Sequence, residues 1–302
     1  MSAFLEMLGA KVGFHISLRD FILLGMSPLF LATFYFEYRY LQKRGVVEQF
    51  IVLRESVVNF LLGGTYQIAE ALISLLFLAV FLSWVEQFQL FNIAVDGPLP
   101  LLALFFLTEF FYYWYHRASH RIRWFWCAHV VHHSSENMNF STAMRQSIMY
   151  PVSGNFLFFL PVVLIGFSAE AVFAAYAVNL AYQYFIHTQQ IPKLHPLVEA
   201  FFNTPSHHRA HHGRNDRYID KNFGGVVIIF DRWFGTFVEE DETEPVDYGI
   251  PRQIHSLNLL TINFHEWIDM FRDASRPGAL WQRLKHFWKP PEWKRAHEQH
   301  AS

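Results

Sequence analysis

Long runs of apolar residues constrain this chain more than any other feature of its sequence. Three runs, at about residues 21–41, 57–84 and 98–115, are long enough to cross a membrane, because about 20 mostly apolar helical residues span the hydrocarbon core of a bilayer. A fourth block, at about residues 150–185, is interrupted at residues 166–168 and predicts a hairpin of two shorter spans or a re-entrant pair. The sequence therefore predicts an all-α, multi-pass transmembrane helical bundle of about four to five spans or re-entrant hairpins.

The composition agrees with a membrane protein and excludes several other classes. Charged residues make up 17% of the chain, against roughly 25% in soluble domains. The formal net charge of −2 gives no indication of a nucleic-acid partner. The single cysteine, Cys127, excludes a disulfide framework and a thiolate-bound iron–sulfur cluster within one chain. No basic stretch leads directly into the first apolar run, so we expect a permanent span there rather than a cleavable signal peptide.

Basic residues predict the orientation of the spans, because Lys and Arg concentrate in short cytoplasmic loops. Five crossings would place every basic segment after the first span on one side, which we expect to be the cytoplasm. We expect one membrane domain, residues 1–302, with a histidine-rich catalytic region at residues 105–237 and a cytoplasmic C-terminal tail or cap at residues 238–302. The basic residues behind this orientation are Lys43, Arg44, Arg54, Arg117, Arg121, Arg123, Arg145, Arg209, Arg214, Arg217 and Lys221.

Histidine is unevenly distributed, and much of it falls into three clusters. Residues three and four apart share one face of a helix, so each cluster can present two or three imidazoles to a common centre. Imidazole suits iron, zinc, copper and nickel, and a single ion cannot accept so many ligands, so the clusters predict two metal ions. His187 stands alone at the end of the hairpin, as a further ligand or as an ordinary polar residue at a membrane surface. The clusters are His116 with His120; His129, His132 and His133; and His207, His208, His211 and His212.

Two carboxylates are candidate catalytic residues. Glu136 follows His132 and His133 at helical spacing, so it is placed to accept an imidazole N–H, and the alternative is a solvated helix end. Glu109 lies seven residues before His116 inside an apolar run. An ionisable residue there is a functional candidate by default, and the alternative is a hydrogen bond that packs two helices together.

In their order, spacing and sidedness, these motifs resemble the histidine boxes of the fatty acid hydroxylase / sterol desaturase superfamily of membrane di-iron enzymes. The resemblance covers residues 105–237 and is greatest to the alkylglycerol monooxygenase branch. It is carried by the stretch 129–146, which begins His-Val-Val-His-His-Ser-Ser-Glu, and by the stretch 203–215, which contains Ser-His-His-Arg-Ala-His-His. The stretches Ile-Asp-Lys-Asn-Phe-Gly-Gly at 219–225 and Asp-Arg-Trp-Phe-Gly-Thr at 231–236 are also similar.

The resemblance implies two non-haem iron ions, O2 as co-substrate, and hydroxylation of a lipid C–H bond such as the ether-linked carbon of an alkylglycerol. It implies an external reductant, either a tetrahydropterin or a separate electron-transfer protein, because no fused cytochrome b5 domain is visible. Some relatives carry a further histidine where this chain has Ile191, so either His195 replaces that ligand or the ligand is absent. The ligands that the resemblance implies are His116, His120, His129, His132, His133, His187, His208, His211 and His212, with His207 less securely matched.

Two other functions stay open at this point. One is desaturation or hydroxylation of a sterol, carotenoid or fatty acid by the same kind of site. The other is a histidine-rich zinc-binding or metal-transporting membrane protein. A transporter places its ionisable ligands near the middle of the membrane, whereas the clusters here lie at or beyond the expected cytoplasmic ends of the spans, which favours an enzyme.

Overall fold

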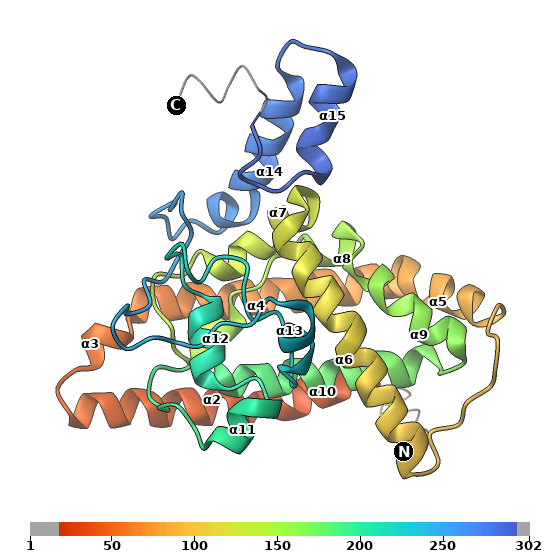
Figure 1. The fold of residues 1–302 in the computed structure, drawn as a ribbon, viewed down its shortest axis with the longest axis horizontal. Coiled ribbons are helices and arrows are strands. Elements are labelled where there is room, and N and C mark those ends of the chain that lie inside the picture. The colour runs from red at the N-terminus through yellow and green to blue at the C-terminus, as the bar shows by residue number, and fades with distance from the viewer. Residues whose placement is uncertain (1–17, 295–302) are drawn as a thin grey trace.

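The computed structural model describes residues 18–294, and within this range the protein is all-helical. The β-pairing described there consists of two isolated bridges, Phe202 with Val227 and Gly213 with Tyr248. The predicted all-α class is therefore confirmed. Figure 1 shows long helices lying side by side across one part of the molecule, shorter helices packed against them, and a helical hairpin that projects from the body.

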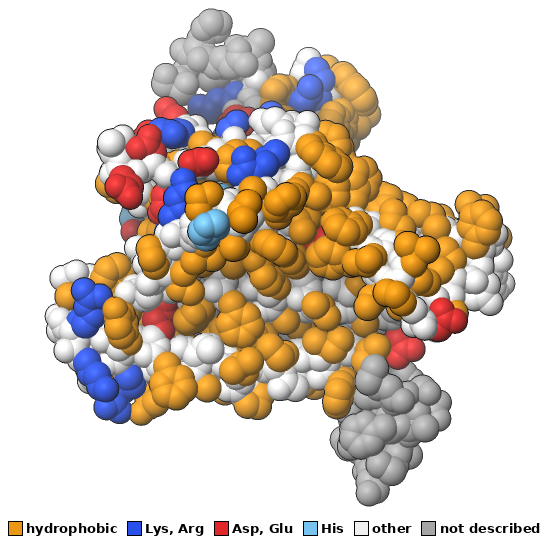
Figure 2. All heavy atoms as spheres, turned by 60° about the horizontal axis from the view of Figure 1, so that its bottom comes forward, with side chains coloured by type: hydrophobic (Ala, Val, Ile, Leu, Met, Phe, Trp, Pro, Cys, Tyr) orange, Lys and Arg blue, Asp and Glu red, His pale blue; other side chains and the backbone are white. Residues whose placement is uncertain are grey.

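Two segments have the length and composition of membrane spans. The first is α2 (Leu18–Lys43), and the second is α4 (Leu53–Ile73), which continues through the π-helical η1 (Ser74–Leu78) into α5 (Ala79–Glu86). Only 17% of the apolar window of each segment is buried. Their apolar side chains therefore face outward, as a lipid-exposed helix requires, and Figure 2 shows these side chains along the surface.

Two further long helices complete the centre of the fold. The third apolar run forms α6 (Pro98–Arg121), in which Pro98 occupies the first turn where its missing N–H costs nothing. Helix α10 (Ala169–Ile186) packs against α2 and α6. The rings of Phe30 in α2 and Tyr184 in α10 stack at 4.1 Å, and the Tyr184 hydroxyl donates to the Phe30 carbonyl. These contacts hold the end of α10 beside α2.

The block at residues 150–185 breaks at the predicted place, but its first half is not a single helix. It consists of α8 (Tyr150–Ser153), the 3-10 helix η3 (Asn155–Phe159) and α9 (Leu160–Ile165), with Gly154 at φ +87° between the first two. Gly166 ends α9 at φ +140°, and a Cβ there would lie 2.5 Å from the Phe91 carbonyl oxygen. A helical segment of residues 155–165 is only about 16 Å long, too short for a core of about 30 Å.

The remaining helices gather around the end of α6. Helix α7 (Arg123–His133) follows α6 after the extended residue Ile122 and folds back on it. The C-terminal helices α14 (Leu259–Ser275) and α15 (Leu280–Trp288) pair as a hairpin against α7. The shorter elements are α3 (Val47–Phe50), η2 (Phe140–Met144), α11 (Pro196–Phe201), α12 (Pro205–His211) and α13 (Ile229–Phe234).

Candidate metal centre

Three helix segments and one helix end deliver the clustered histidines. His116 and His120 lie one turn apart on α6, and α7 carries the second cluster in its last two turns. Helix α12 begins at Pro205, after Thr204 caps its first turn by accepting from the His207 backbone N–H. His187 is the residue that follows α10. Helices from distant parts of the sequence therefore bring their histidine faces to one place.

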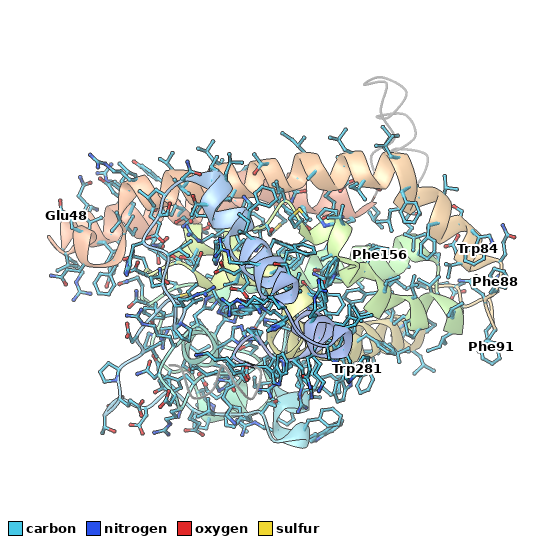
Figure 3. All side chains as sticks on the ribbon, turned by 90° about the horizontal axis from the view of Figure 1, so that it is seen from above. Glu48, Trp84, Phe88, Phe91, Phe156 and Trp281 are labelled. Atoms are coloured by element: carbon cyan, nitrogen blue, oxygen red, sulfur yellow. The ribbon has the colours of Figure 1, made fainter. Side chains whose placement is uncertain are left out.

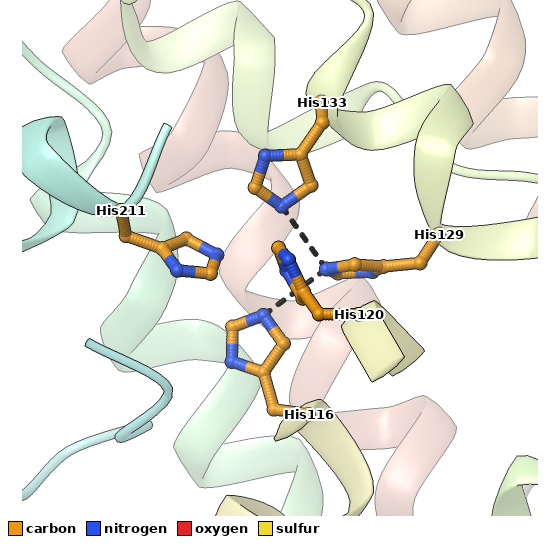
Figure 4. A group of neighbouring side chains, drawn as sticks. All are labelled: His116, His120, His129, His133 and His211. Atoms are coloured by element: carbon orange, nitrogen blue, oxygen red, sulfur yellow. Dashed lines mark hydrogen bonds between the residues drawn. The ribbon is translucent and has the colours of Figure 1, made fainter. Parts of the chain in front are cut away.

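The imidazoles form two buried groups. The five rings of the first group converge on a common centre, with Nε2 of His129 between those of His116 and His133 (Figure 4). In each group the potential ligand atoms all lie within 4.8 Å of one another. The first group contains His116, His120, His129, His133 and His211, and the second contains His132, His187, His208 and His212.

The two groups adjoin because α7 and α12 each contribute to both. Helix α7 gives His129 and His133 to the first group and His132 to the second. Helix α12 and the residue that follows it, His212, do the reverse, giving one histidine to the first group and two to the second. The rings of His133 and His212, which belong to different groups, stack at 4.4 Å. The structure thus has the layout of a centre with two adjacent metal positions.

The Nδ1 atoms of several rings point outward to fixed acceptors. His116 Nδ1 donates to the Phe223 carbonyl at 2.9 Å, His187 Nδ1 to the Gln183 carbonyl at 2.6 Å, and His211 Nδ1 to the Lys221 carbonyl at 2.8 Å. A carbonyl oxygen only accepts, so in each of these rings the proton is on Nδ1 and the Nε2 lone pair faces the group. Such outer hydrogen bonds orient metal-binding imidazoles.

The Nε2 atoms that face the centre of each group are better placed to bind metal ions than to hydrogen-bond to one another. Neighbouring Nε2 atoms lie 2.9–3.2 Å apart in five pairs, and the buried Nε2 atoms of His120 and His211 have no hydrogen-bond partner. Two nitrogens bound at right angles to one ion at about 2.1 Å lie about 3 Å apart. Facing lone pairs at this spacing repel each other unless a cation lies between them, so the donor set fits two transition-metal ions.

Burial keeps these imidazoles in the form that binds metal. Removal from water, together with the neighbouring imidazoles, lowers the pKa of His129, His132, His133, His208 and His212 well below the usual value near 6.5. A neutral ring has a free lone pair, whereas a protonated ring cannot bind a cation. At neutral pH the group therefore offers uncharged nitrogen ligands.

Glu109 holds together the segments around the site. Its carboxylate is buried and accepts hydrogen bonds from Asn179 Nδ2 at 2.5 Å and from the backbone N–H groups of Val226 at 2.8 Å and Val227 at 3.1 Å. This arrangement joins α6 to α10 and to the loop whose Phe223 carbonyl orients His116. The contacts match the helix-packing alternative, and a catalytic role for Glu109 stays a prediction.

Glu136 lies away from the clustered imidazoles. Helix α7 ends at His133, so Glu136 does not continue the helical face of His132. Its side chain is 43% exposed, and its described partners are Gln253 Nε2 at 2.9 Å and His255 Nδ1 at 2.8 Å. The proposed catalytic role of Glu136 is a prediction without a supporting contact among the described residues.

Two further histidines also lie outside both groups. His207 is buried, with Nε2 2.8 Å from Glu199 Oε2 and Nδ1 3.2 Å from the Phe202 carbonyl oxygen. His195 is exposed and caps α11 by accepting from the Leu197 N–H. The structure places His207 beside a carboxylate and His195 at a helix start, so the nine other predicted ligands are the ones that it brings together.

Several residues that support the site were not singled out from the sequence. The Tyr150 hydroxyl lies 2.5 Å from His129 Nδ1, and Asp220 Oδ1 lies 3.6 Å from His120 Nδ1. Arg145 is fully buried and donates to the Val131 carbonyl and to Ser134 Oγ, which holds the last turn of α7. Asp220 and Arg145 both lie within stretches that carry the family resemblance, at 219–225 and 129–146, but neither was given a role at the site.

A cavity of about 430 Å³ adjoins the imidazoles. His116, His129, His132 and His187 line it, and aromatic side chains make much of the remaining wall. Further lining comes from α2 and α4, including Leu24, which is itself exposed on the outer surface. The cavity therefore connects the histidine site with the two long apolar helices.

Comparison with known proteins agrees with the site. The fatty acid hydroxylase family profile matches residues 101–236. The chain is 40% identical over 209 residues to alkylglycerol monooxygenase of Homo sapiens, covering 69% of this chain and 46% of that protein. The identity to the Caenorhabditis elegans enzyme of the same name is 34% over 219 residues, covering 69% and 42%.

A more distant relative is an ornithine lipid hydroxylase of Rhizobium tropici, 26% identical over 148 residues, which cover 49% of this chain and 44% of that protein. No solved structure matches the chain. The chain spans less than half the length of the alkylglycerol monooxygenases that it matches. Over residues 101–236 this chain belongs to the fatty acid hydroxylase family, and it is a membrane-associated relative of the alkylglycerol monooxygenases.

Proposed function

We propose that this protein is a membrane-bound di-iron oxygenase that uses O2 to hydroxylate a C–H bond of a lipid. The observation that carries the proposal is the pair of adjoining imidazole groups, five and four, beside a cavity walled by the two long apolar helices. The iron ions, when bound by these nine histidines, supply the redox chemistry that activates O2.

The protein's own residues position the ligands and shape the cavity. The carbonyls of Phe223, Gln183 and Lys221 fix the orientation of three rings. The aromatic wall of the cavity excludes water from the position of the substrate C–H bond. Exclusion of water protects a reactive oxidant from side reactions. An alkyl chain can reach the site from the bilayer because α2 and α4 form part of the wall.

The substrate that we propose is an ether-linked glycerolipid, because the relatives with 34–40% identity are named alkylglycerol monooxygenases. The reaction inserts one oxygen atom of O2 into the C–H bond next to the ether oxygen and reduces the other to water, with two electrons and two protons from an external donor. The hemiacetal product then breaks into an aldehyde and a free glycerol hydroxyl. A tetrahydropterin or a separate electron-transfer protein is the proposed donor.

A related lipid substrate is the second candidate. The ornithine lipid hydroxylase is similar to this chain over 148 residues, so the same site could act on another lipid, including a sterol, a carotenoid or a fatty acid, by hydroxylation or desaturation. A zinc-binding or transporting protein is the candidate from a different class. Retention of two zinc ions with no lipid oxidation under any reductant would favour it.

Isotope-labelled oxygen tests the proposal. The purified full chain is loaded with iron and supplied with a 1-O-alkylglycerol, ¹⁸O2 and either tetrahydropterin or a reduced electron carrier, and the product aldehyde is trapped by borohydride as a fatty alcohol. We expect ¹⁸O in that alcohol, and its loss in His132→Ala. The control is His265→Ala, because His265 lies on α14 outside both groups. Absence of oxidation with alkylglycerol, sterol and fatty acid alike, in iron-loaded protein, would refute the proposal.

We also propose a multi-pass topology with the histidine site facing the cytoplasm. A cysteine introduced at Asp216, which is exposed in the loop after α12, tests this orientation. The native Cys127 is fully buried, so the unmodified chain serves as the labelling blank. An impermeant maleimide should label Asp216→Cys only after the cells are permeabilised. Labelling from outside intact cells would place the site on the opposite side.

A further inference from the structure

The C-terminal helix α15 turns its apolar side outward. Leu280, Trp281, Leu284 and Trp288 lie on one face of this helix, and all four are exposed, Leu280 by 65% and Trp281 by 62%. The inward side is the more polar one: His286 is buried, and Arg283 Nε donates to the Ala274 carbonyl. An amphipathic helix of a globular protein normally does the opposite, so this face needs a partner outside the described chain.

The outward face continues onto α14. Leu260, Ile268 and Phe271 are exposed on this helix, and the rings of Phe271 and Phe287 meet edge to face at 5.6 Å, which joins the two helices. Figure 2 shows hydrophobic side chains along one flank of the projecting hairpin. The hairpin therefore presents one apolar surface built from both helices.

The start of α14 packs against a membrane-span candidate. Ile262 of α14 packs with Leu62 of α4 in one buried cluster, and Val58 and Leu259 pack against it. On α4, the neighbouring residue Leu61 is exposed, as are the other outward side chains of that helix. The start of α14 lies beside α4 in Figure 3. A bilayer that surrounds α4 would thus meet the hairpin as well.

The residue types on the hairpin match the surface layer of a membrane. Trp281, labelled in Figure 3, and Trp288 have ring centroids 4.8 Å apart, and Lys285 and Lys289 lie beside them. Tryptophan concentrates at the boundary between headgroups and acyl chains. Lysines flanking an apolar helix face are typical of helices that lie in this boundary and attract anionic headgroups.

We infer that the α14–α15 hairpin lies in the headgroup region of the bilayer, with Leu280, Trp281, Leu284 and Trp288 inserted among the lipids. The C-terminal segment is then a second membrane-contacting element, in addition to the apolar spans, rather than a cap surrounded by water. Because α14 packs on α7, which carries three of the metal-binding histidines, this contact also fixes the depth of the histidine site relative to the membrane surface.

Lipid-borne quenchers test this contact in the full chain. A bimane fluorophore is attached to a cysteine introduced at Trp281, and the matched control carries it at Gln282, which is exposed and lies about 100° around α15 from Trp281, outside the apolar face. Both proteins are reconstituted in phosphatidylcholine nanodiscs with nitroxide at the headgroup or along the acyl chain. Metal content, which should equal that of the unmodified chain, shows that both variants are folded.

We expect lipid nitroxide to quench the label at position 281 at least threefold more than the label at 282, most strongly with nitroxide near the headgroup. Aqueous iodide should show the reverse order. Adding phosphatidylglycerol should increase the lipid quenching at 281, and Lys285→Glu should remove that increase. Equal lipid quenching at the two positions would overturn the inference. Shielding of position 281 from both quenchers would also overturn it, and would indicate a protein partner or a second copy of the chain.

Discussion

The second imidazole group has four potential ligands and the first has five, so losing one imidazole should weaken metal binding more in the second group. His132, His187, His208 and His212 form this group, so His132→Ala leaves only three imidazoles for its ion. The first group keeps all five of its imidazoles in this variant. We expect this group to bind its ion more weakly, so that the metal content of purified protein falls from two ions per chain towards one.

The same substitution should also destabilise the fold. An ion present at about 100 times its dissociation constant stabilises the native state by about 2.7 kcal/mol, and this contribution is lost with the ion. The truncation additionally removes the buried His132 ring, whose centroid lies 5.0 Å from that of the His187 ring, and leaves a cavity in its place. We therefore expect a loss of about 3 kcal/mol or more, seen as a clear fall in the thermal unfolding midpoint.

The assay combines elemental analysis with thermal unfolding of the same detergent-purified samples. His120→Ala is the comparison within the site, because it leaves four imidazoles in the first group and should retain more metal than His132→Ala. His265→Ala is the control outside the site and should keep two ions. Two tightly bound ions in His132→Ala, or equal metal loss in His265→Ala, would refute the division of the ligands into five and four.

Three further substitutions test the surroundings of the site. Gly225→Ala places a Cβ 2.0 Å from Asn179 Nδ2 and should destabilise the fold by about 1–3 kcal/mol, measured by thermal unfolding. Gly25→Ala is the control, because no atom lies within 4 Å of its new Cβ. Equal unfolding midpoints for the two variants would contradict the close packing at Gly225. Glu109→Gln turns an NH2 group toward at least one of the three buried N–H donors that the carboxylate now accepts from. This should lower the free energy of unfolding by about 1–3 kcal/mol and reduce metal content and activity together. Lost turnover at full metal content would instead show that Glu109 is catalytic. Glu136→Gln should change unfolding by about 1 kcal/mol or less, because exposed ion pairs contribute little; a tenfold or larger loss of turnover would establish a functional role for Glu136.

Local spacing was enough to identify nearly all of the candidate ligands. The intervals of three and four residues within 116–120, 129–133 and 208–212 depend only on helix geometry, and the structure brings all eight of these histidines together. His187, which belongs to no such interval and was implied by the resemblance, joins them. His207 is the exception: it lies beside Glu199, a contact that no interval in the sequence predicts. The break at Gly166 was also predictable, because glycine is the residue that accepts a positive φ.

The tertiary structure decided which imidazoles share an ion and what the carboxylates contact. Successive helical residues are rotated by about 100°, so His132 and His133 point in different directions, and only the packing of α6, α10 and α12 around α7 assigns them to different groups. The same is true of Glu109, whose acceptor role depends on a loop more than 100 residues later in the chain. Glu136 was predicted to share a helix face with His132 and His133, but α7 ends at His133 and Glu136 lies outside the helix. Helical periodicity determines which side chains share a face of one helix, whereas contacts between distant segments determine which faces meet.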